Sequence, residues 1–163
     1  MKALRRGLDG LYLACGFAAA GCLLLILVII VVQMVLRWTG NTFPGAASYA
    51  GYAMAAASFL AFAHALTMGA HIRVGMLLNA AGDRRWMVEI WCTGVAMVLT
   101  WFLARFAVKT AHWSWKLGDI SQGQDATPLW IPQSLWAFGA VVFAIAMTDR
   151  FVRLVLTRDL PEH

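Results

Sequence analysis

Four long apolar runs, separated by shorter polar stretches, dominate the pattern of hydrophobic and polar positions along the chain. They cover Leu11–Leu36, Ala46–Ala70, Trp86–Val108 and Leu129–Thr148. At about 1.5 Å per residue, a helix of each length can cross the roughly 30 Å hydrocarbon core of a bilayer. Backbone N–H and C=O groups in lipid must form hydrogen bonds within their own segment, so such runs form helices. The pattern predicts an all-α membrane protein with four transmembrane helices in a single integral membrane domain, residues 1–163.

Composition supports a membrane protein and leaves little chain for a soluble domain. Hydrophobic residues make up 61% of the sequence, and the mean hydropathy is +0.71. A β-barrel would need strands that alternate apolar and polar residues, whereas Leu23–Val32 is continuously apolar. The cysteines Cys15, Cys22 and Cys92 fall inside predicted spans without metal-ligand spacing, so we interpret them as packing residues.

The basic residues are distributed unevenly between the two sides of the predicted membrane. Nine lie before the first span, between the second and third, or after the fourth: Lys2, Arg5, Arg6, Arg73, Arg84, Arg85, Arg150, Arg153 and Arg158. The other four are Arg37, Arg105, Lys109 and Lys116. By the positive-inside rule, both termini and the middle loop are expected in the cytoplasm. The net charge of +5 therefore reflects topology, and no nucleic-acid partner is predicted.

The second span has a small residue at every fourth position. These residues, here called the α-ridge, are Ala53, Ala57, Ala61, Ala65 and Gly69. In lipid no hydrophobic force drives helices together, so small residues are favoured where two backbones approach closely. Packing within the bundle and docking against another subunit are both open interpretations of the α-ridge.

Polar residues near the ends of the spans are candidates for contacts with lipid or with a partner. The candidates are Arg37, His71, Arg73, Arg105 and Lys109. Residues 71–82 form a short amphipathic stretch, which predicts a helix lying in the membrane interface, and a simple re-entry turn is the open alternative. The charge-free run Ile90–Ala104 is too short to cross alone, so Glu89 and Arg105 are expected near opposite interfaces.

The longest polar loop is predicted on the periplasmic side, over residues 112–128. Its charged and amide side chains are those of Lys116, Asp119, Gln122, Gln124 and Asp125. His64 lies within the second span, where an ionisable residue is a functional candidate by default. A structural role for His64 is open beside a proton or cofactor role.

No sequence motif for catalysis or metal binding is present. The chain has no P-loop, nucleophile elbow, HExxH motif or CxxC motif. Apart from His64, no ionisable residue lies near the middle of a span, where a self-sufficient transporter binds its solute. We therefore expect a membrane scaffold or accessory subunit that is not an enzyme and has no catalytic residue, metal or cofactor of its own.

Two segments resemble the small permease subunits of TRAP transporters, the DctQ-like family. One is Ser48–Leu60 with His71-Ile72-Arg73-Val74, and the other runs from Ser121-Gln122-Gly123 through Ala126–Pro132. The four-helix layout and the length also agree, so the resemblance covers essentially the whole chain. It implies a multi-pass subunit of the bacterial inner membrane that scaffolds a large (M-type) permease subunit.

The resemblance also implies a division of labour between subunits. The large subunit would hold the sodium and substrate sites, and a periplasmic (P-type) substrate-binding protein would deliver an organic acid for cation-driven symport. The α-ridge and the apolar face of the first span would then contact the large subunit. Lys116, Asp119, Gln122, Gln124 and Asp125 of the periplasmic loop would dock the binding protein. The identity of the transported acid is not encoded in this chain.

Two other function classes are open on the residues alone. A haem- or quinone-binding anchor of a respiratory complex would use intramembrane histidines as ligands, but His64 and His112 are expected at different depths. A small independent carrier would need a membrane carboxylate, and no span has one near its centre.

Overall fold

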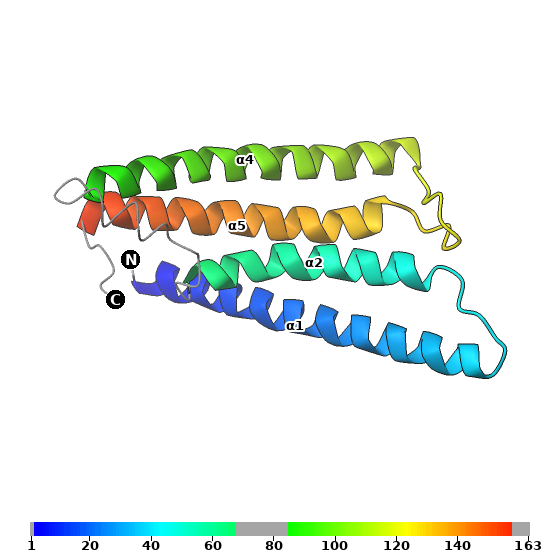
Figure 1. Ribbon diagram of the computed structural model, residues 1–163. Coiled ribbons are helices and arrows are strands. Elements are labelled where there is room, and N and C mark those ends of the chain that lie inside the picture. Colours follow the sequence, from blue (N-terminus) through cyan, green and yellow to red (C-terminus); the bar gives the residue numbers. More distant parts are fainter. Residues whose placement is uncertain (1, 68–84, 158–163) are drawn as a thin grey trace.

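The computed structural model describes residues 2–67 and 85–157, and four long helices make up most of both ranges (Figure 1). The helices, numbered as in Figure 1, are α1 (Lys2–Trp38), α2 (Ala46–Thr67), α4 (Arg85–Leu117) and α5 (Trp130–Thr157). Each contains a segment long and apolar enough to cross a membrane. The predicted all-α class with four spans is confirmed. The predicted interfacial segment 71–82, with His71 and Arg73, lies outside the described residues, as does Gly69.

Three of the helices extend beyond the predicted spans. Helix α4 continues to Leu117, so residues 112–117 are helical although they were predicted as part of the periplasmic loop. No glycine or proline interrupts the chain between Gly94 and Gly118, where a positive φ of 67° ends the helix. At 33 residues, α4 is about 50 Å long and exceeds the roughly 40–45 Å of a whole bilayer.

The helices lie side by side in the order α4, α5, α2 and α1 (Figure 1). Helices α2 and α5 pack against each other in the middle, whereas α1 packs mainly on α2 and α4 on α5. The arrangement is an open row, with α1 and α4 at its two edges. We call the end with the start of α1 and the last turn of α5 the terminal end, and the opposite end the loop end (Figure 1).

Small residues allow the neighbouring helices to approach closely. One buried cluster joins α1, α2 and α5, and consists of Tyr12, Cys15, Ala19, Leu60, Ala63, Leu66, Val142 and Ala146. A second joins α4 and α5, and consists of Ala104, Ala107, Ala137, Ala140 and Ala144. At the α2–α5 contact, a Cβ on Gly139 would lie 2.8 Å from the Phe59 carbonyl carbon, so only glycine fits there. Packing through alanine and glycine is typical of membrane helices.

Helix α1 diverges from α2 toward the loop end (Figure 1). Its inward-facing residues are buried at Tyr12 and Ala19, but only half-buried at Ile26 and Ile29. Over Leu23–Val35, large apolar side chains are exposed on most sides of the helix. The outer half of α1 therefore presents an apolar surface that no described residue of the chain covers.

Candidate functional site

At the loop end, the loop between α4 and α5 is tied to the start of α2 by a cluster of hydroxyl and carboxylate groups. The Tyr52 hydroxyl donates to Asp125 Oδ2 at 3.0 Å, and the Ser121 hydroxyl donates to Asp125 Oδ1 at 3.0 Å. Tyr52 Oη also lies 3.0 Å from Ser121 Oγ. We call these three residues the loop anchor. They join two segments that are far apart in sequence and fix the loop on α2.

Further contacts hold the loop anchor in place. The Thr127 hydroxyl lies 3.4 Å from the Tyr49 hydroxyl, and the Ser121 amide donates to the Thr127 carbonyl at 2.8 Å. Gly45, in the turn before α2, has a φ of 80°, and a Cβ there would lie 2.7 Å from Asp125 Cβ. Only glycine satisfies both the positive φ and the close approach. The loop is thus held by several independent contacts.

The same contacts control the charge of Asp125. Desolvation raises the pKa of this carboxyl, but hydrogen bonds from Thr127, its own backbone, Ser121 and Tyr52 outweigh it and lower the pKa to about 2. Hydrogen bonds to the charged form favour that form. Asp125 is therefore ionised at neutral pH, and both of its carboxylate oxygens accept hydrogen bonds from the chain itself.

The other candidate docking residues face outward. Lys116, Asp119, Gln122 and Gln124 are exposed, whereas Asp125 is partly buried. The Asp119 amide donates to the Ser114 carbonyl, and its carbonyl accepts from the Leu129 amide, both at 3.0 Å. The backbone of Asp119 is therefore fixed while its carboxylate reaches solvent. The loop combines an inward structural residue, Asp125, with an exposed polar rim.

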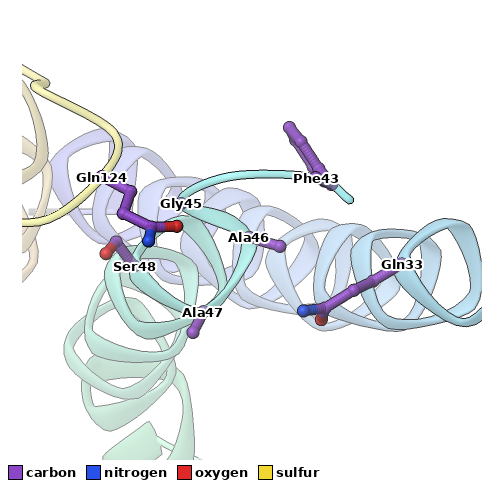
Figure 2. A pocket seen from close by; sticks show the side chains of 7 residues that line it. All are labelled: Gln33, Phe43, Gly45, Ala46, Ala47, Ser48 and Gln124. Carbon is purple, nitrogen blue, oxygen red and sulfur yellow. The ribbon is translucent and has the colours of Figure 1, made fainter. Parts of the chain in front are cut away.

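A pocket of about 250 Å³ opens beside this loop (Figure 2). It is lined by Gln33 of α1, Phe43 of the first loop, Gly45, the first turn of α2 (Ala46–Ser48), and Gln124. In Figure 2, the side chains of Ser48 and Gln124 lie next to each other, and Gln33 enters from α1. A hydroxyl and two amides can hydrogen-bond a polar group, but this lining contains no carboxylate, histidine, cysteine or basic side chain.

At the terminal end, α4 and α5 are joined by an ion pair. Arg150 Nη2 lies 3.3 Å from Glu89 Oε1, and the side chain of Glu89 is buried. The Trp86 indole donates to the Leu154 carbonyl at 3.4 Å. Arg153 pairs with Asp149 one turn away on α5 and is more exposed. These contacts position α4 against α5 where the charge-free part of α4 begins.

Comparison with known protein families matches residues 26–157, most of the chain, to the tripartite ATP-independent periplasmic transporters, DctQ component. The chain belongs to the DctQ family. It is thus a small subunit of a TRAP transporter and a multi-pass membrane protein. Comparisons with curated proteins and with solved structures give no match. The resemblance noted in the sequence is confirmed.

The α-ridge of this DctQ chain does not form one continuous exposed face. Ala53 and Ala57 are only 7% and 5% exposed, whereas Ala61 and Ala65 are half-buried. Ala61 packs against the cluster that joins α1, α2 and α5. Each step of four residues turns about 40° beyond a full helical turn, so the α-ridge winds around α2. Its first residues therefore pack helices of the chain itself.

His64 of the DctQ chain lies against α1. A Cβ on Gly16 would come within 2.9 Å of His64 Cγ, so glycine at this position makes room for the imidazole. His64 is near the terminal end of α2, whereas His112 is near the loop end of α4. The two histidines lie at opposite ends of the helices, so they cannot both bind the iron of one haem. Within residues 2–67 and 85–157, no group of three or more His, Cys, Asp or Glu residues is placed to hold a metal.

The remaining lipid or partner candidates lie on the two edges of the row. Arg37 is exposed in the last turn of α1, and Arg105 and Lys109 are exposed on α4. The sequence identified these residues by their charge. It did not reveal the loop anchor, because Tyr52 has no distinguishing pattern around it and its partners follow much later in the chain.

Proposed function

We propose that this DctQ chain is an accessory scaffold for the large permease subunit and does not itself bind the transported solute. The observation that carries the proposal is the outer half of α1, where large apolar side chains over Leu23–Val35 are exposed at an open edge. A helix edge of this kind can pack against another membrane protein without reorganising the rest of the row. Docking there would widen the membrane anchor of the large subunit.

The distribution of charge supports the absence of a solute site in this chain. No Asp, Glu, Lys, Arg or His occurs in residues 10–36, 46–63, 90–104 or 130–148, which make up the central parts of the four spans. Carboxylate solutes and coupling ions need polar or charged groups near the bilayer midplane. We therefore assign the sodium and organic-acid sites to the large subunit, where cation-driven uptake would take place.

The exposed rim of the outer loop is the proposed docking surface for the periplasmic substrate-binding protein. Lys116, Asp119, Gln122 and Gln124 offer charges of both signs and amide groups. The loop anchor holds the backbone of the loop residues Asp119, Gln122 and Gln124 in a fixed position before any partner arrives. Preorganisation of this kind reduces the entropy lost on docking.

The membrane in this proposal is the bacterial inner membrane, with the terminal end in the cytoplasm. Nine of the thirteen basic residues precede the first predicted span, follow the fourth or lie between the second and third, on the side favoured for cytoplasmic loops. This orientation turns the outer loop toward the periplasm, where a soluble binding protein can reach it.

Reconstitution into liposomes tests the division of labour. Vesicles would contain this chain alone, the large subunit alone, or both, with the loaded binding protein outside and an inward sodium gradient. We expect uptake only when both membrane subunits are present. Uptake by this chain alone would contradict the proposal, as would full activity of the large subunit without it.

A further inference from the structure

The face of α4 that points away from α5 has a regular row of basic side chains. Arg105, Lys109, His112 and Lys116 follow each other at spacings of four, three and four residues, which places them on one side of the helix. All four are exposed, whereas Ala104, Ala107 and Ser114 are buried toward α5. We call the four residues the α4 basic stripe. No acidic residue follows Glu89 in α4, so nothing on this helix neutralises it.

Exposed aromatic rings flank the α4 basic stripe. Three exposed rings lie on the neighbouring face of α4, separated by four and then seven residues: Phe102, Phe106 and Trp113. Lys109 Nζ lies 5.9 Å from the centre of the Phe106 ring, and Lys116 Nζ lies 5.4 Å from that of Trp113. Each ring is three residues earlier in α4 than the lysine beside it. Aromatic rings beside cations are typical of the membrane–water interface.

The depth of the α4 basic stripe matches a phospholipid headgroup layer. Glu89, in the buried ion pair at the terminal end, marks the start of the charge-free run. Lys109 lies about 30 Å further along α4, which equals the thickness of the hydrocarbon core. The stripe therefore starts close to the hydrocarbon boundary at the loop end and continues through the headgroup region.

We infer that the α4 basic stripe binds the headgroup of an anionic phospholipid in the leaflet at the loop end. The phosphate would lie between the ammonium groups of Lys109 and Lys116, and the acyl chains would follow the exposed rings of Phe102 and Phe106. Clustered cations at headgroup depth attract anionic lipid. The inference requires only that α4 spans the membrane and does not depend on the proposed transport role.

Native mass spectrometry of the full-length protein, extracted from nanodiscs of equal parts phosphatidylglycerol and phosphatidylcholine, tests this site. The test variant is the double substitution Lys109→Gln and Lys116→Gln, and the control is Arg37→Gln, which removes an exposed cation at the same end but on α1. We expect the wild type and the control to retain phosphatidylglycerol preferentially. The double variant should lose that preference by about tenfold or more.

Circular dichroism and thermal unfolding of each variant in phosphatidylcholine alone would show that the fold is intact, since all substituted side chains are exposed. Equal retention of phosphatidylglycerol by wild type and double variant would overturn the inference. Loss of co-purification with the large subunit, at unchanged phosphatidylglycerol retention, would also overturn it by assigning the stripe to a protein partner.

Discussion

The Tyr52 hydroxyl lies 3.0 Å from a carboxylate oxygen of Asp125, a residue 73 positions later in the chain. This contact connects α2, in the middle of the row, with the loop that joins α4 to α5. The loop end of the molecule is thereby fixed by polar contacts, whereas the outer half of α1 beside it is apolar and exposed. The two surfaces suit different partners, one soluble and one embedded in the membrane.

Removing the Tyr52 hydroxyl should loosen the outer loop without unfolding the helices. In Tyr52→Phe, Asp125 loses the hydroxyl that donates to its Oδ2, so amides over residues 118–129 should exchange with solvent several-fold faster. Hydrogen-exchange mass spectrometry of the purified protein measures this directly. Tyr49→Phe is the matched control, because its contact with Thr127 is longer at 3.4 Å, and its effect should be smaller. Equal exchange in all three proteins would contradict the role of the loop anchor.

The stabilisation provided by Asp125 should disappear only in acid. The pKa of this carboxyl is lowered to about 2, compared with about 3.9 in an unfolded chain. Because the folded pKa is the lower one, the stabilisation is complete above about pH 4 and is lost as the pH falls to about 2.

The pH prediction is checked by comparing the wild type with Asp125→Asn. The difference in melting temperature between them should be constant from neutral pH to about pH 4.5 and should shrink toward about pH 2. A difference that already declines near neutral pH would show that another group controls the loop.

Substituting Gly139 by alanine should destabilise the contact between α2 and α5. The added Cβ would lie 2.8 Å from the Phe59 carbonyl carbon and 3.0 Å from the Leu60 nitrogen, and backbone atoms cannot rotate away. We expect a loss of about 1–3 kcal/mol, the usual range for overpacking. Gly21→Ala in α1 is the control, because no atom lies within 4 Å of its Cβ position. Thermal unfolding in detergent should separate the two variants, and equal stability would contradict the packing at Gly139.

The ion pair between Glu89 and Arg150 should contribute more than the pair between Asp149 and Arg153. The Glu89 side chain is 8% exposed, whereas those of Asp149 and Arg153 are 26% and 40% exposed. Glu89→Gln leaves the partly buried Arg150 without its anion and should lower stability by about 1–3 kcal/mol. Asp149→Asn should lower it by less than about 1 kcal/mol. Denaturation of both variants measures the free energy of unfolding that each ion pair contributes. A larger loss in Asp149→Asn than in Glu89→Gln would contradict the importance of the buried pair.

The sequence predicts the elements of this fold better than their arrangement. Apolar runs of sufficient length identify the four helices that the structure describes, because lipid leaves few alternatives for an apolar backbone. The charge-free run Ile90–Ala104 predicts Glu89 and Arg105 near opposite interfaces, and Glu89 lies in the second turn of α4. The sequence places the start of the periplasmic loop at residue 112, whereas α4 continues to Leu117, because no glycine or proline breaks the helix before Gly118.

Contacts between distant residues are the part that the sequence does not reveal. The loop anchor depends on the order of helices in the row, and apolar periodicity does not determine which helices are neighbours. The α-ridge illustrates the same point. Ala53 and Ala57 match the pattern of small residues that allows close packing, but the pattern does not identify the helix that packs against them. The space that Gly16 leaves for His64 likewise becomes visible only when α1 and α2 are placed together.

Bulky substitutions on the two edges of the row should affect binding of the large subunit differently. Leu24 on α1 and Leu99 on α4 are similarly exposed, at 64% and 60%, so tryptophan at either position should leave the fold intact. We expect Leu24→Trp to weaken co-purification of the large subunit at least fivefold, because overpacking an interface costs about 1–3 kcal/mol. Leu99→Trp should have little effect. The opposite ranking would move the interface from α1 to α4.

The most direct test of the scaffold proposal is affinity purification of the tagged wild-type chain from native membranes in mild detergent, with quantitative mass spectrometry of its partners. The proposal predicts one large polytopic membrane protein, in equal amount with this chain and retained through size-exclusion chromatography. Recovery of this chain without a membrane partner, together with solute transport by it alone, would contradict the proposal.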